Sequence, residues 1–248
     1  VRPGSSMVKS SEAHGSACYG IIFANWPANP TYNGMDTNAE QGIFIYYGLS
    51  TQFNGATSRL TLNTQATDPA GPYRSCFQTS SVGSPQITAY STISAETDDY
   101  LFQVDYLSFQ SQSNTGTMDS RPQAWAKNIV SVGGIGWQST LTRADDNYPG
   151  SSFGPAADGR LKPDLANCYD QIPSSWGSST TGTTIFGGTS GATPITAGDG
   201  GLLLQMWHQS VFPGFGGGSS VFADRPRSTT AKALMVNTAY RYPLTQGD

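Results

Sequence analysis

The stretch 186–198, with the sequence FGGTSGATPITAG, is the most informative part of this chain. It places Ser190 between small residues, directly before an apolar run that reaches Trp207. This pattern predicts a helix that begins near Ser190, where unpaired backbone N–H groups and the helix dipole favour negative charge. Such a position suits a serine nucleophile beside a developing oxyanion. It equally suits a serine that only caps a helix, so a second motif has to decide between the two interpretations.

The composition of the 248 residues excludes several classes of protein. Charged residues make up 12% of the chain and the net charge is −4, so there is no basic surface of the kind that nucleic acids require. No window approaches 18 consecutive apolar residues, and we therefore expect no membrane-spanning helix and no membrane partner. The polar, weakly charged surface is typical of a secreted protein, extracellular or periplasmic, from which any leader peptide has been removed.

The three cysteines, Cys18, Cys76 and Cys168, give no zinc motif, because none of them belongs to a C-x-x-C pair. An odd number leaves at least one thiol, and a disulfide between Cys76 and Cys168 stays an open alternative. The pattern requires no cofactor. The acidic run 145–147 is a weak candidate for calcium, but a solvated loop is the simpler interpretation, so a structural calcium stays unassigned.

Strands and helices alternate along the chain and are joined by polar loops. The spacing of apolar residues predicts helices over 12–26, 86–104, 190–209 and 229–239, and strands over 42–48, 57–63, 105–112 and 129–135. This alternation predicts an α/β fold, with a mainly parallel sheet covered by helices on both faces and an active site beyond the carboxyl ends of the strands. We expect residues 1–248 to form one domain.

Two histidines are available as a general base for Ser190. His208 lies on the same predicted helix as Ser190, about 27 Å away at a rise of about 1.5 Å per residue, so we expect it to be a surface residue. His14 opens the helical segment HGSACYG. A histidine at a helix start is commonly a cap or a core residue. Its place in the chain, well before Ser190, nevertheless matches one of the known orders of a catalytic triad.

Four stretches together resemble the subtilases, a superfamily of subtilisin-like serine peptidases. The stretch 187–194 resembles the serine signature, with Gly191 where methionine is usual, and 14–20 resembles the histidine signature. The stretch 151–164 resembles the loop that leads into the strand before the serine, and 126–133 resembles the strand after the oxyanion residue. The oxidatively stable alkaline proteases are the branch most similar to this chain. The resemblance implies a three-layer subtilisin-like fold from which the N-terminal strands are missing.

The resemblance also implies an activity, namely a serine endopeptidase that cleaves protein or peptide substrates through an acyl-enzyme. Ser190 would be the nucleophile, and His14 would accept its proton and return it to the leaving amine. Asn114 would donate its side-chain N–H to the oxyanion. Cys18, four residues after His14 on the same helix face, would be a buried free thiol.

The catalytic aspartate of the family has no counterpart in the expected place. It precedes the histidine in subtilases, but residues 1–13 contain no aspartate. Asp36 follows His14 and lacks the adjoining glycine. The resemblance therefore implies that the aspartate lies upstream of this chain, or comes from a propeptide or a separate N-terminal chain. In subtilisin the loss of this aspartate lowers turnover about 3 × 10⁴-fold, so we expect this fragment alone to be weak or inactive.

Two segments that the resemblance assigns to substrate binding depart from the family pattern. Ser111, Gln112 and Ser113 stand where Ala-Ala-Gly is usual, and Thr64 and Gln65 align with the Ser-Trp-Gly edge strand. These segments form pocket walls and pair with an extended peptide backbone. Their divergence, together with the missing aspartate, keeps open a second interpretation, a catalytically impaired pseudoprotease that acts as a binding module.

Two other hydrolase families fit the chain less well. A sedolisin has a similar serine signature but uses a glutamate in place of the histidine, and His14 and the stretch 158–164 disfavour it. An α/β-hydrolase lipase or esterase requires a glycine two residues after the serine, where Ala192 stands.

Overall fold

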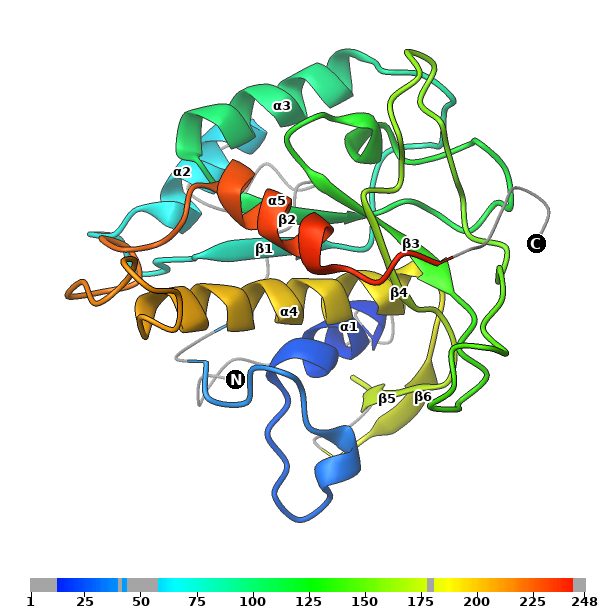
Figure 1. Cartoon of the computed structure of the whole chain (residues 1–248), viewed down its shortest axis with the longest axis horizontal. Helices are drawn as coiled ribbons and strands as arrows, with labels where there is room; N and C mark the ends of the chain where they lie inside the picture. Colours follow the sequence, from blue (N-terminus) through cyan, green and yellow to red (C-terminus); the bar gives the residue numbers. More distant parts are fainter. Residues whose placement is uncertain (1–12, 40–41, 44–57, 178–180, 243–248) are drawn as a thin grey trace.

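The computed structural model describes residues 13–39, 42–43, 58–177 and 181–242 (Figure 1). Most of the strand predicted over 42–48 lies outside these residues. At the centre of the described part is a parallel sheet in the order β1-β2-β3-β4. Its strands are β1 (Phe77–Ser80), β2 (Leu107–Ser111), β3 (Val130–Ile135) and β4 (Leu165–Cys168).

Neighbouring strands of this sheet end at the same edge. Thr79 of β1 is in register with Phe109 of β2, and Ser111 of β2 is in register with Val132 of β3. The carboxyl ends of β1 and β2 therefore lie side by side. In open parallel sheets this edge is where ligands bind.

Helices cover both faces of the sheet, which confirms the predicted α/β three-layer architecture (Figure 1). One face carries α1 (Ala13–Phe23), α4 (Thr189–His208) and α5 (Ser228–Thr238), and the other carries α2 (Arg59–Thr67) and α3 (Thr92–Val104). Short 3-10 helices span Pro30–Tyr32 (η2) and Pro122–Trp125 (η4). An antiparallel hairpin of β5 (Ile172–Ser175) and β6 (Thr183–Phe186) leads into α4.

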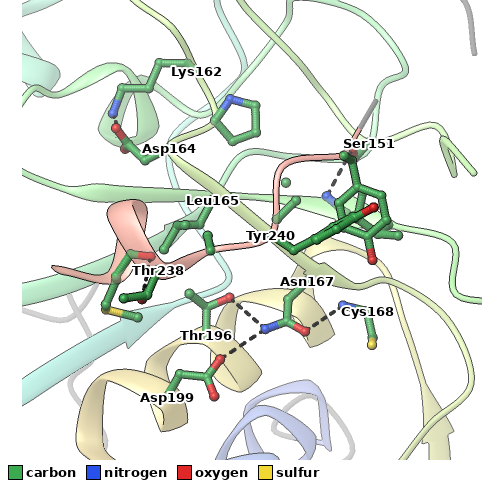
Figure 2. A pocket seen from close by; sticks show the side chains of 18 of the residues that line it. Ser151, Lys162, Asp164, Leu165, Asn167, Cys168, Thr196, Asp199, Thr238 and Tyr240 are labelled. Atoms are coloured by element: carbon green, nitrogen blue, oxygen red, sulfur yellow. Dashed lines mark hydrogen bonds and ion pairs between the residues drawn. The ribbon is translucent and has the colours of Figure 1, made fainter. Parts of the chain in front are cut away.

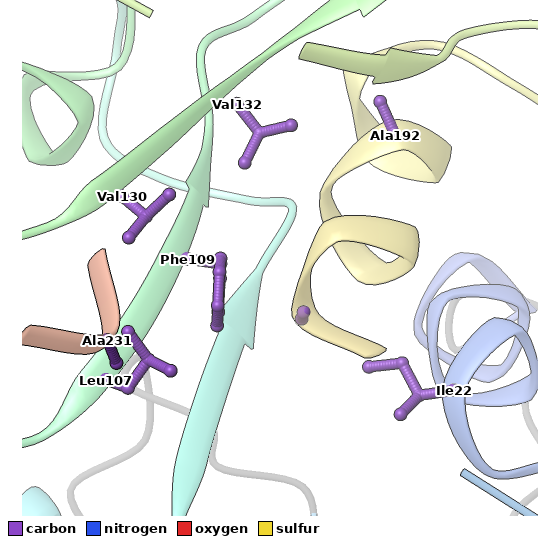
Figure 3. Close-up of a cluster of buried hydrophobic side chains, with 8 residues drawn as sticks. Ile22, Leu107, Phe109, Val130, Val132, Ala192 and Ala231 are labelled. Carbon is purple, nitrogen blue, oxygen red and sulfur yellow. The ribbon is translucent and has the colours of Figure 1, made fainter. Parts of the chain in front are cut away.

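The larger hydrophobic core joins the sheet to α1, α4 and α5 (Figure 3). Figure 3 shows side chains of β2 and β3 pointing toward Ala192 of α4 and Ile22 of α1. The buried members of this core are Ile22, Leu107, Phe109, Val130, Val132, Ala192, Ala197 and Ala231. Because α1 and α4 share this core, their amino-terminal turns are held in a fixed relation to each other.

The β5–β6 hairpin fixes the first half of α1. The hydroxyl groups of Ser174 and Ser175 donate to the carbonyl oxygens of Ala17 and Ser16, at 2.6 and 3.0 Å. A Cβ atom at Gly20 would meet the Ser174 hydroxyl at 2.7 Å, so only glycine allows this close approach. The hairpin also carries the chain into the serine motif, and it thus ties the two sequence signatures together.

The structure confirms the strands predicted over 105–112 and 129–135 and the helices predicted near 12–26, 190–209 and 229–239. The strand predicted over 57–63 is wrong, because Ser58 caps α2 there and its hydroxyl accepts the Thr61 N–H at 3.0 Å. The helix predicted over 86–104 begins only at Thr92. No helix of the described residues is long and apolar enough to cross a bilayer.

Candidate active site

Ser190 lies in the first turn of α4, as the sequence predicts. The helix begins at Thr189, and the preceding Gly188 has φ +78°, a conformation that favours glycine. Ser190 is 9% exposed, at the end of the helix where backbone N–H groups have no helical acceptor. The position combines a hydroxyl group with unpaired backbone donors and the positive end of the helix dipole.

Asn114 lies beside the first turn of α4 and contacts Thr189, the residue before Ser190. It follows β2, and its Oδ1 accepts hydrogen bonds from both the backbone N–H and the hydroxyl of Thr189, at 2.8 and 2.9 Å. These two bonds hold the amide so that Nδ2 is the donor left for another acceptor. Asn114 thus places a side-chain N–H donor beside the backbone N–H groups of the first turn of α4, and these are the two kinds of donor that an oxyanion hole combines.

His14 lies in the first turn of α1 and is linked to Ser190 through Cys18. The His14 Nδ1 lies 3.9 Å from Cys18 Sγ, and this thiol donates to the Ser190 carbonyl oxygen at 3.4 Å. The imidazole also meets the edge of Phe186, with ring centroids 5.3 Å apart. The structure therefore brings His14, Asn114 and Ser190 together from three distant segments of the chain.

Cys18 is a buried thiol, as predicted. Burial raises its pKa to about 11, so it is a neutral thiol at physiological pH and not a second nucleophile. All three cysteines lie in the described part of the chain, and none of them forms a disulfide. The alternative of a Cys76–Cys168 bridge is therefore not realised in this structure.

Ser81 is a site residue that the sequence analysis missed. Its hydroxyl donates to the Ser190 carbonyl oxygen at 3.0 Å, from the position immediately after β1. The short strand β1 lies within a stretch that reads as a loop, and this concealed the site residue. The run Ser81-Val82-Gly83 directly after the short apolar-polar stretch 77–80 was the signal that could have identified it.

The residues assigned to substrate binding lie in two separate places. Ser111, Gln112 and Ser113 are buried at the end of β2, next to Asn114. Thr64 and Gln65 lie on α2, which packs against α3 on the opposite face of the sheet from α4. The structure does not bring these two helical residues to Ser190, because the segment is a helix and not an edge strand.

The His14 imidazole has no carboxylate partner among the described residues. Burial lowers its pKa below the ordinary value of 6.5. Asp36 is too far from His14 to be its partner. The backbone N–H of Asp36 donates to the carbonyl oxygen of Ile22, and Ile22 lies about 12 Å from His14 along α1 at a rise of about 1.5 Å per residue. Burial and the nearby Asp199 carboxylate raise the pKa of Asp36 to about 6.

A cavity of about 640 Å³ extends from His14 along the open edge of β1. His14, Cys18 and Ile22 of α1 line one side of it, and Phe77–Ser80 line another. Within the described part of the chain β1 pairs only with β2, so its other edge faces this cavity. This cavity therefore adjoins both that edge of β1 and the His14 side chain.

A larger cavity, of about 1490 Å³, lies elsewhere, between β4, α4 and α5 (Figure 2). Within it, Asn167 donates to the Thr196 hydroxyl at 3.4 Å and to Asp199 at 3.3 Å. Burial raises the pKa of Asp199 to about 6. None of the three candidate catalytic residues lines this cavity, so its size alone does not make it the site.

The described residues contain no group of three His, Cys, Asp or Glu side chains placed to hold a metal ion. In the run 145–147, Asp145 accepts a hydrogen bond from the Thr140 hydroxyl at 2.9 Å. Asp146 accepts one from the Tyr242 hydroxyl at 2.6 Å. These two carboxylates thus serve as hydrogen-bond acceptors for neighbouring loops.

Gly191 packs closely against the β5–β6 hairpin. A Cβ atom there would lie 2.5 Å from Ile172 Cδ1, the end of a side chain that can rotate away, so we expect Gly191→Ala to lower the free energy of unfolding by about 1 kcal/mol through overpacking. Urea denaturation measures this change. Ile172→Val removes the Cδ1 atom and is the matched test, since the double variant should lose less stability than the two single changes added together. Simple additivity would contradict this account of Gly191.

Comparison with known proteins places the chain in a family. The profile of Peptidase_S8, the subtilase family, matches residues 3–247. No curated protein sequence matches the chain. Similar solved structures are the patellamide maturation protease PatA (17% identity, TM-score 0.62, 96% of this chain and 77% of that one) and the prenylagaramide maturation protease PagA (17%, 0.60, 92% and 72%).

A cold-adapted subtilisin-like serine proteinase is similar as well, with 19% identity, a TM-score of 0.56 and coverage of 91% of this chain and 67% of that one. At these identities the structural likeness shows the fold, and the profile match over nearly the whole chain shows the family. The serine and histidine signatures, the parallel sheet and the site at its carboxyl edge all agree with this result. The chain belongs to the subtilase family of serine peptidases.

Proposed function

We propose that this chain is the peptidase domain, over residues 1–248, of a serine endopeptidase that cleaves protein or peptide substrates through an acyl-enzyme. One observation carries the proposal, namely the convergence of three remote segments on the first turn of α4. Asn114 is bound to Thr189, and Cys18 links His14 to the Ser190 carbonyl. A serine that only capped a helix would need neither neighbour.

Each of the three residues has a role in the proposed reaction. The His14 imidazole, neutral at pH 7, takes the proton of the Ser190 hydroxyl as that oxygen attacks the scissile carbonyl carbon. The carbonyl oxygen becomes an oxyanion that accepts from Asn114 Nδ2 and the backbone N–H of Ser190. His14 then returns the proton to the leaving amine, and water hydrolyses the acyl-enzyme by the same steps.

A carboxylate from outside the described residues is proposed to complete the triad at His14 Nδ1. The cavity along the open edge of β1 adjoins His14, and an extended strand that paired with this edge could carry an aspartate to the imidazole. The donor is an upstream segment, a propeptide or a separate N-terminal chain. A carboxylate there would orient the ring and stabilise the imidazolium that forms during acylation.

The pH dependence of acylation tests this assignment. Burial lowers the pKa of His14, and only the neutral imidazole can accept a proton. The rate of Ser190 labelling by a fluorophosphonate should therefore fall with decreasing pH, with a midpoint below 6.5. A carboxylate partner favours the imidazolium, so adding the aspartate-bearing strand should move this midpoint upward. A profile that did not move would show that the carboxylate does not reach His14.

Substrate backbone is proposed to bind between the segments that follow β1 and β2. Ser111, Gln112 and Ser113 keep the assignment made from the sequence, because they adjoin Asn114. We propose that residues 81–83, and not Thr64 and Gln65, form the other segment that binds the substrate backbone. Residues 81–83 follow an edge strand and contact Ser190 through Ser81.

A pseudoprotease remains the second candidate. The observation that favours it is the placement of His14 Nδ1 against Cys18 Sγ, at 3.9 Å, instead of a carboxylate. A folded protein that bound peptides but never reacted with the fluorophosphonate would establish this function.

The finer properties that the resemblance implies are also proposals. We propose secretion, for which the weakly charged, polar composition is the support. We also propose that the chain is related to the oxidatively stable alkaline proteases. Gly191 stands where the family usually has a methionine, so no thioether lies beside the nucleophile for peroxide to oxidise. No cofactor is proposed for the reaction.

A further inference from the structure

We propose that the side chain of the substrate residue whose carbonyl is attacked enters between the loops that follow β1 and β2, and that only a small side chain fits there, because a hydrogen bond from Gln86 to Ser113 joins these loops. This inference rests on the proposed peptidase function and narrows its substrates to peptides with glycine, alanine or serine before the scissile bond. Gln86 and Ser113 are then the residues that determine specificity.

Two loops extend from the adjacent carboxyl ends of β1 and β2 and contact the first turn of α4. Ser81, after β1, donates to the Ser190 carbonyl at 3.0 Å, and Asn114, after β2, is bound to Thr189 at 2.8 Å. In the proposed complex, the substrate side chain next to the attacked carbonyl enters between these loops.

A side-chain hydrogen bond joins these two loops near Asn114. Gln86 Nε2 donates to Ser113 Oγ at 3.0 Å. Gln86 is exposed, whereas Ser113 is 5% exposed, so the amide lies over the serine from the solvent side. A large substrate side chain would have to break this bond and displace the amide.

Further bonds stop the loop after β1 from moving aside. Gln110 Nε2 donates to the Val82 carbonyl at 3.0 Å, and Arg121 donates to the Ser84 carbonyl at 3.0 Å. Gln123 donates to the Ser84 hydroxyl at 3.2 Å. With this loop held at Val82 and Ser84, the two loops cannot move apart without loss of several hydrogen bonds, each of which contributes to stability.

The loss of reactivity toward large side chains follows from these contacts. A pocket that must give up a hydrogen bond to admit a group discriminates against that group by about tenfold or more. The change Ser113→Gly is compatible with the fold, because Ser113 has φ +119°, a conformation that favours glycine. Gln86 is exposed, so Gln86→Ala is tolerated as well.

The test uses the folded chain extended at its N-terminus to include an aspartate-bearing strand, and it compares the labelling rates with three probes. These are an alkyl fluorophosphonate without a peptide and two tripeptidyl diphenyl phosphonates that carry alanine or phenylalanine at the reacting position. We expect the alanine probe to label Ser190 at least tenfold faster than the phenylalanine probe. The double variant Gln86→Ala/Ser113→Gly should reduce this ratio to near one or invert it. Gln103→Ala, which removes an exposed glutamine of α3 bound to Asp99, is the matched control and should keep the ratio.

Equal rates for the two peptidyl probes in the unmodified chain, or a ratio that the double variant leaves unchanged, would overturn the inference alone. Absence of labelling by the alkyl fluorophosphonate would overturn the proposed function together with it. The two failures are therefore distinguishable.

Discussion

Replacement of His14 by alanine is expected to slow the acylation of Ser190 by an amount that depends on the triad carboxylate. In subtilisin, loss of the histidine costs about 2 × 10⁶ in turnover and loss of the aspartate about 3 × 10⁴, and loss of all three triad residues costs no more than loss of the histidine. Without the carboxylate, loss of the histidine therefore lowers turnover only about 10²-fold further. For His14→Ala we expect acylation to slow about 10²-fold in the chain alone and about 10⁶-fold when an aspartate-bearing strand is present.

The chain offers a matched control for this experiment. His208 is its other histidine and lies in the last turn of α4, 3.8 Å from Asp224, at the opposite end of the helix from Ser190. His208→Ala should leave the labelling rate unchanged. Equal effects of the two replacements, measured as rates of fluorophosphonate labelling, would contradict the role assigned to His14.

Replacement of Asp164 by alanine is expected to cause the largest loss of stability. Asp164 binds Lys162 Nζ at 2.7 Å and Lys232 Nζ at 2.8 Å, and so ties β4 to α5. The Lys162 side chain is 2% exposed, and burial lowers its pKa to about 8 despite the Asp164 carboxylate. Without Asp164 this lysine would be a buried charge with no partner. Loss of one partner of a buried pair costs about 3–5 kcal/mol, which urea denaturation at pH 7 would measure.

Two further variants decide whether the buried charge is the cause. Lys162→Met in the Asp164→Ala background removes the unpaired ammonium and should recover part of the loss. Asp158→Ala, at an exposed pair with Arg160, should change stability little. No recovery in the double variant would show that the cost arises elsewhere.

The same pair predicts how stability depends on pH. Burial would raise the pKa of Asp164, but Lys162 and Lys232 outweigh it and hold the pKa below the ordinary value of 3.8. Since the native carboxylate stays ionised where the unfolded one takes up a proton, its contribution is complete above pH 3.8 and is lost as the pH falls below that value.

The sequence predicted the parts of the fold that are long and strongly patterned. The apolar run after Ser190 and the strand over 129–135 have periodicities that few alternatives share, and both are confirmed. The short strand β1 was not predicted, because its four residues, Phe77–Ser80, are all half-buried and include only one large apolar side chain. The helix α2 was taken for a strand because its cap, Ser58, and its threonines suit either structure.

The site was predicted only where a side chain belongs to a signature. Ser190 and His14 lie in such signatures, whereas Asn114 was assigned from the resemblance although Ser111–Ser113 before it depart from the family pattern. The structure brings the three residues together. Ser81 was missed because its contact is made to the backbone carbonyl of Ser190, which no local pattern encodes. The bond between Gln86 and Ser113 joins two loops through the fold and could not be inferred from spacing.

The most direct test of the proposed peptidase is labelling of Ser190 by an alkyl fluorophosphonate. It should be measured on this chain and on a form extended at its N-terminus to include an aspartate-bearing strand, both shown to be folded. We predict labelling at Ser190 that is much faster in the extended form and is lost in its His14→Ala variant. No labelling of either folded form would contradict the proposal and establish a subtilase fold that does not act as a peptidase.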